Sequence, residues 1–104
     1  MYEKARSAVR IQAAVPVVLD RGTGTTENFS YAGVYFVSDQ SYSLGDCIPF
    51  TLVLGATVTD PPMLMECYGC VVRVEPRGRV FGTAATIDSF WITAPGDKKR
   101  EATA

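Results

Sequence analysis

The chain has 104 residues, of which 47% are hydrophobic and 20% are charged, and its formal net charge is −1. This length and balance predict a single small globular domain rather than a disordered or multidomain chain. A net charge so close to zero argues against a general binder of nucleic acids or anionic membranes. The sequence has no histidine, which excludes a His-containing triad or metal site and removes the commonest general base.

The chain divides into three predicted parts. A polar arm is expected over residues 1–12, a β-barrel over 13–94, and a polar tail, expected to be disordered, over 95–104. In the middle part, apolar and β-branched runs alternate with turn residues and predict strands at 14–21, 25–28, 34–38, 48–54, 63–75 and 79–90. Six short strands without a convincing helix predict an all-β fold, a small six-stranded antiparallel split barrel with a flexible N-terminal arm. Trp91 and Ile92 are expected to pack against the barrel end.

The fifth predicted strand changes its apolar phase halfway along. Residues 63, 65 and 67 share one phase and residues 70, 72 and 74 share the other, so a one-residue bulge near Gly69 would give one buried face. Cys67 and Cys70 are then expected to be small buried hydrophobic residues. They also form a CxxC motif, but only Cys47 remains as a further ligand and a structural zinc site usually needs four. No metal site is expected.

The cysteine count and the apolar runs bear on cellular location. An odd number of cysteines without an evident leader peptide indicates a reducing compartment. No apolar run approaches the ~20 residues that a spanning helix needs, so direct membrane insertion is not expected. We therefore expect a cytoplasmic protein, and the Met1 start suggests a complete small chain.

Two arginines in the arm, Arg6 and Arg10, form an RxxxR element. Their planar guanidinium groups can pair bidentately with phosphate oxygens or with the O6/N7 edge of guanine, and they can stack on a purine ring. Taken alone, the same two residues could be a solvated charged face.

A tight turn is predicted from Asn28 to Gly33, directly before an apolar strand. Asn28 tolerates left-handed conformations and bonds nearby backbone groups, Ser30 bonds them more weakly, and Gly33 permits a positive φ or a close approach. Such a turn can present N–H and hydroxyl donors to an anion. Taken alone, it could be an ordinary hairpin corner.

In this order, the RxxxR arm and the NxSxxG turn on an all-β pattern resemble the PilZ domain family, over roughly residues 4 to 90. The resemblance implies a bacterial receptor for the second messenger cyclic di-GMP. Arg6 and Arg10 would then grip the guanine edges and phosphates, while Asn28, Ser30 and Gly33 would receive the ligand on the barrel surface. Ordering of the arm would change the surface offered to a protein effector, such as motility or exopolysaccharide machinery. No catalytic residue and no cofactor besides this ligand is implied.

The chain departs from the family pattern at two places. Ala5 stands where many members carry a further arginine, which favours one bound ligand molecule over two stacked molecules. Many members also end in a C-terminal helix, for which Pro95, Gly96 and the polar tail leave little room.

Two other functions stay open. The chain could be a PilZ-like scaffold that binds a protein and has little affinity for nucleotides. It could also be a small barrel that binds single-stranded nucleic acid by stacking bases on Tyr31 and Tyr35, although its acidic balance argues against this. An enzyme is not expected, because no base–nucleophile pair is visible. Three arginines near one predicted hairpin are interpreted as solvated charges: Arg73, Arg77 and Arg79. The alternative for Arg73 is that it neighbours the ligand.

Overall fold

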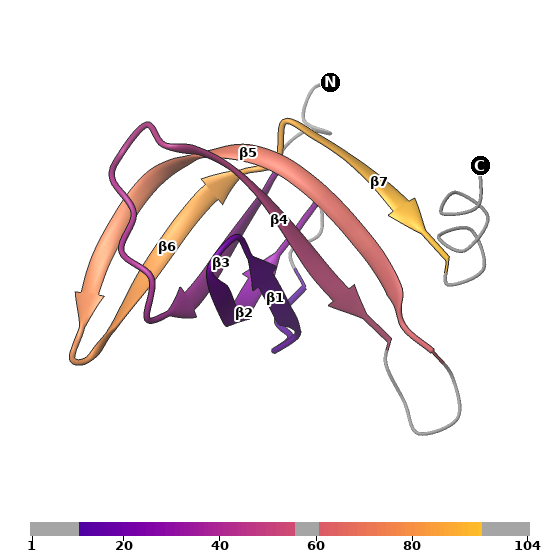
Figure 1. Ribbon diagram of the computed structural model, residues 1–104, viewed down its shortest axis with the longest axis horizontal. Coiled ribbons are helices and arrows are strands. Elements are labelled where there is room, and N and C mark those ends of the chain that lie inside the picture. The colour runs from indigo at the N-terminus through magenta and orange to yellow at the C-terminus, as the bar shows by residue number, and fades with distance from the viewer. Residues whose placement is uncertain (1–10, 56–60, 95–104) are drawn as a thin grey trace.

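A computed structural model describes residues 11–55 and 61–94 of the chain (Figure 1). These residues form seven strands and no helix, and hence no helix long and apolar enough to cross a membrane. The predicted arm before residue 11 and the predicted tail lie outside the described residues. The strands are β1 (Pro16–Leu19), β2 (Gly22–Phe29), β3 (Gly33–Ser38), β4 (Cys47–Leu54), β5 (Met63–Arg77), β6 (Val80–Thr86) and β7 (Ser89–Thr93).

The strands close into a barrel in which all neighbours are antiparallel. Their order is β4-β1-β2-β3-β6-β5, and β5 pairs back with β4 to complete the circle. β5 is the longest strand and curves over the top of the barrel in Figure 1. Its first half pairs with β4 and β7, and its second half pairs with β6. The predicted antiparallel six-stranded barrel is confirmed, with β7 as one additional strand.

The last predicted strand, 79–90, is two strands in the structure. The chain leaves β6 at Ile87, whose N–H donates to the Ala32 carbonyl, and then Asp88 donates to the Tyr68 carbonyl. It continues as β7 along the other half of β5. In β7, Trp91 lies opposite Glu66 on the outer surface and is 59% exposed, so the expectation that it packs against the barrel end is wrong.

The predicted bulge is present, but it lies three residues further along. β4 and β5 pair regularly through Gly69, and the register shift occurs between Val71 and Arg73 in the β5–β6 pairing. Val71 is buried and Val72 is exposed. Gly69 serves a different purpose, because a Cβ there would collide with the carbonyl of Thr86.

The cysteines differ from expectation in one respect. Cys67 is buried as predicted, and burial raises the pKa of its thiol to about 12. Cys70 does not contribute to the core; it lies directly opposite Cys47 across β4 and β5, and the two form a disulfide. Only the register between these strands reveals this pairing, since the residues are 23 positions apart.

The core fills the barrel interior with alternate side chains of the strands. Phe29 and Val34 are buried on the two sides of the β2–β3 turn, at 8% and 2% exposure, and Phe36 is fully buried. A strand that alternates in this way exposes every second residue to the outer surface. The turn is therefore anchored by core residues, while its neighbours in the strands face solvent.

Candidate functional site

The turn between β2 and β3 is held by its own polar groups. The Ser30 N–H donates to the Gly33 carbonyl at 2.9 Å, and the Ala32 N–H donates to the Ser30 Oγ at 3.1 Å. Ser30 is only 6% exposed. The expected bond between its hydroxyl and nearby backbone is confirmed, and this bond leaves the hydroxyl hydrogen available for donation.

The other two residues of the NxSxxG element lie in strands, so the turn is shorter than predicted. Asn28 pairs with Tyr35 in the β2–β3 ladder, one residue after a register irregularity at Glu27. No described non-glycine residue has a positive φ, so Asn28 does not adopt a left-handed conformation. Gly33 begins β3 without a positive φ. Of the two reasons predicted for this glycine, the close approach holds, because a Cβ would lie 3.2 Å from the Ala85 carbonyl oxygen.

Asn28 opens onto a polar hollow on the outer wall of the barrel. The hollow has a volume of about 580 Å³ and crosses β2, β3, β6 and β5. The strand registers place Asn28, Tyr35, Ala84 and Arg73 in one row across these strands. Its full lining is Glu27, Asn28, Val34, Tyr35, Arg73, Glu75, Arg77 and Ala84.

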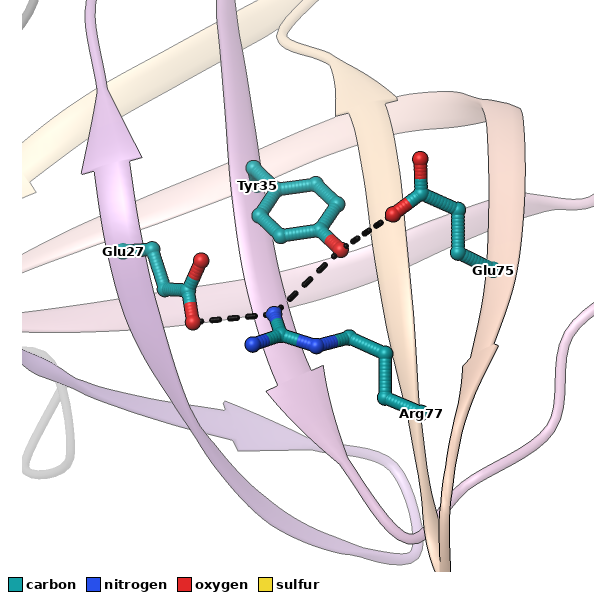
Figure 2. Close-up of polar contacts among 4 residues, drawn as sticks. All are labelled: Glu27, Tyr35, Glu75 and Arg77. Carbon is teal, nitrogen blue, oxygen red and sulfur yellow. Dashed lines mark hydrogen bonds and ion pairs between the residues drawn. The ribbon is translucent and has the colours of Figure 1, made fainter.

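Tyr35 is the centre of a hydrogen-bonded network in this hollow (Figure 2). Its hydroxyl donates to Glu75 Oε1 at 2.8 Å and accepts from Arg77 Nη1 at 3.5 Å. The same Arg77 nitrogen donates to Glu27 Oε2 at 2.9 Å. Arg73 lies over the Tyr35 ring, with Cζ 5.5 Å from the ring centroid, and its Nε is 3.5 Å from Glu75 Oε2. Burial, and then the bond to Glu75, raise the pKa of Tyr35, so the phenol stays neutral at physiological pH.

The charges in the hollow cancel, because two arginines face two glutamates. A dianionic ligand would therefore need positive charge from elsewhere. Arg6 and Arg10, predicted for this role, lie outside the described residues. The arm enters the barrel at the turn, however: Ile11, which directly follows Arg10, exchanges two backbone hydrogen bonds with Phe29, at 2.7 and 3.1 Å.

The inner side of the turn is apolar. A cavity of about 300 Å³ opens there. Among its described lining residues, only Ser30 and Tyr31 carry a hydroxyl group. Tyr31 stacks on Phe90 of β7, with ring centroids 5.7 Å apart. Ser30 and Asn28 therefore line different cavities, and a ligand that contacts both must span the turn. The lining of the inner cavity is Ile11, Phe29, Ser30, Tyr31, Leu54, Met65 and Ile92.

The sequence interpretation missed the network around Tyr35. One signal could have suggested it: Arg73, Glu75 and Arg77 alternate along one strand and so share its outer face. Their connection to Glu27 and Tyr35 depends on the barrel register. The described residues hold no group of three or more His, Cys, Asp or Glu side chains that could bind a metal ion.

Comparison with known proteins gives a structural match. No protein-family model matches the chain, and no curated protein matches it. Among solved structures, the chain is similar to the Bacillus subtilis Inhibitor of motility (MotI/DgrA), with a TM-score of 0.67 and 20% sequence identity. The match covers 91% of this chain and 46% of that chain, so this chain spans about half the length of that protein. At this identity, the similarity shows a shared fold.

Proposed function

We propose that this chain binds cyclic di-GMP between its N-terminal arm and the outer side of the β2–β3 turn. The observation that supports the proposal is the place of Ile11, the residue that directly follows the RxxxR element, beside the NxSxxG element. Ile11 exchanges backbone hydrogen bonds with Phe29, which directly precedes Ser30, so Arg10 is one residue along the chain from this contact. Arg6 and Arg10 would supply the positive charge that the hollow lacks, along with planar groups for guanine and phosphate.

The barrel residues would have distinct roles in this complex. The Ser30 hydroxyl would donate to a ligand oxygen while its oxygen keeps the Ala32 N–H. Asn28 would offer its amide from the rim of the hollow. Gly33 would let the backbone of β3 lie close to β6, which keeps the turn in place. The barrel side would be preformed, so affinity would depend on the entropy cost of ordering the arm.

The output would be the ordered arm itself, presented to a protein effector of the cytoplasm. The structural neighbour is named an inhibitor of motility, so motility machinery is the first effector class to test. No enzymatic activity is proposed for the chain. Binding of single-stranded nucleic acid is less well supported, because Tyr35 is only 8% exposed and lies beneath Arg73.

The proposal can be tested by calorimetric titration of variants with cyclic di-GMP. Arg10→Ala should cost roughly 2–5 kcal/mol of binding free energy, because it removes one partner of a charge-assisted contact. Arg79→Ala is a matched control, since Arg79 is exposed and outside the site. Equal affinity of the two variants would refute the role of the arm, and equal affinity of Ser30→Ala would refute the role of the turn.

A further inference from the structure

Arg73 has an environment that suits stacking better than charge pairing. Its Nε is 3.5 Å from a carboxylate oxygen of Glu75, and its guanidinium lies over the Tyr35 ring, with Cζ 5.5 Å from the centroid. The carboxylate lies beside the Nε edge of the planar group, and the Tyr35 ring lies below its Cζ. The Arg73 side chain is still 60% exposed, so a ligand can reach it from solvent.

Tyr35 fixes this arrangement from below. It is 8% exposed, and its hydroxyl is tied to Glu75 at 2.8 Å. Gly82 lies beneath the phenol, and any Cβ there would collide with the hydroxyl oxygen. The ring is thus confined, and Glu75 holds both the ring and the guanidinium. Arg73 therefore has two protein partners before any ligand arrives, which lowers the entropy cost of using it.

Arg73 and Asn28 lie at opposite ends of one row across four strands, with Tyr35 and the small side chain of Ala84 between them. Three strand spacings of about 4.8 Å separate the backbones of the end residues by roughly 14 Å, and the Arg73 side chain shortens this span by reaching back over the Tyr35 ring. A ligand received at Asn28 and the turn can therefore extend across the hollow to the Arg73 guanidinium, which lies over the Tyr35 ring. A ligand with two bases joined through phosphates is of the kind that could contact both ends.

We propose that Arg73, supported by Tyr35 and Glu75, is a stacking platform for a purine base of the ligand. The inference rests on the proposed function and adds a third arginine, from the barrel, to the two in the arm. Glu75 neutralises Arg73, so a phosphate gains little from approaching it. A flat base gains the stacking contact without displacing the carboxylate, because the base takes the face and Glu75 keeps the edge.

Calorimetric titration of the full chain with cyclic di-GMP tests this platform. Arg73→Ala should weaken binding about tenfold or more, in the range found for loss of one stacking contact to a base. Arg73→Lys keeps the charge and loses the plane, so its affinity should resemble that of Arg73→Ala. Arg79→Ala, on the same hairpin and exposed, should bind as the unaltered chain does. Circular dichroism should show the same β-sheet content for all variants.

A second readout separates stacking from a structural effect. Saturating cyclic di-GMP should shift the Arg73 Nε–H proton resonance upfield, because a purine ring stacked on the guanidinium shields it. Unchanged affinity of Arg73→Ala, full affinity of Arg73→Lys, or an unshifted resonance would each overturn the platform. If the unaltered chain still binds cyclic di-GMP, the proposed function stands in each of these cases. Failure of the unaltered chain to bind would overturn both.

Discussion

Breaking the Cys47–Cys70 disulfide should lower the free energy of unfolding by about 3 kcal/mol. The bond joins β4 and β5 across a sequence separation of 23 residues. In the chain-entropy model, a loop of this size restricts the unfolded chain by about 3 kcal/mol at 25 °C. The folded barrel should persist without the bond, because the β4–β5 ladder continues from Ile48–Gly69 to Leu54–Met63.

Urea unfolding with and without reductant, followed by circular dichroism, measures this difference. For an m-value between about 1 and 3 kcal/mol per molar urea, the midpoint should fall by about 1–3 M on reduction. A Cys47→Ala/Cys70→Ala double variant should already have the lower midpoint and should not respond to reductant. Thiol titration of the unfolded protein should find one free thiol, Cys67, before reduction and three after it.

An unchanged midpoint on full reduction would refute the entropic argument, and three free thiols in the unreduced protein would refute the disulfide itself. The second result would have a bearing on location, because cytoplasmic proteins generally keep their cysteines reduced. The odd cysteine count alone indicated such a compartment; the pairing of Cys47 with Cys70 accounts for two of the three.

Three further predictions concern single residues. Because burial raises the pKa of the Cys67 thiol from 9.0 to about 12, the folded state keeps this proton to higher pH than the unfolded state. The free energy of unfolding should therefore be maintained below about pH 9 and fall by up to about 1.4 kcal/mol per pH unit above it. Urea unfolding at each pH measures this change, and Cys67→Ala should lack the part of the pH dependence that comes from the thiol. Gly69→Ala should cost about 1–3 kcal/mol, because the added Cβ collides with the Thr86 carbonyl, and an unchanged melting temperature would contradict that contact. Ser30→Ala should cost about 1 kcal/mol by leaving the Ala32 N–H without its acceptor, and faster hydrogen exchange at Ala32 should accompany it.

The barrel could be predicted from sequence because its strands carry local signals. In β3, Val34 and Phe36 are fully or nearly fully buried, and the β-branched and aromatic content of this segment is typical of a strand. The phase change in β5 likewise required a bulge. Its position could not be predicted, since periodicity shows only that a residue is inserted, while the pairing with β6 places the shift between Val71 and Arg73.

Features that depend on contacts distant in sequence were not predictable. The segment Ser89–Thr93 looks like a continuation of β6, and only the free edge along the first half of β5 makes it a separate strand. The bond between Glu27 and Arg77 joins residues 50 positions apart. Asn28 was expected in a turn from its intrinsic preference, but its pairing with Tyr35 holds it extended.

The central claim is that the outer side of the β2–β3 turn receives cyclic di-GMP together with the arm. The most direct measurement is a ¹⁵N NMR titration of the full chain with micromolar cyclic di-GMP. The account predicts saturable shifts of the Asn28, Ser30 and Gly33 amides and of the Arg10 side chain, with Gly78 at the β5–β6 hairpin unshifted. Amide resonances at the turn that do not move at saturating nucleotide, or shifts confined to the hairpin, would contradict it.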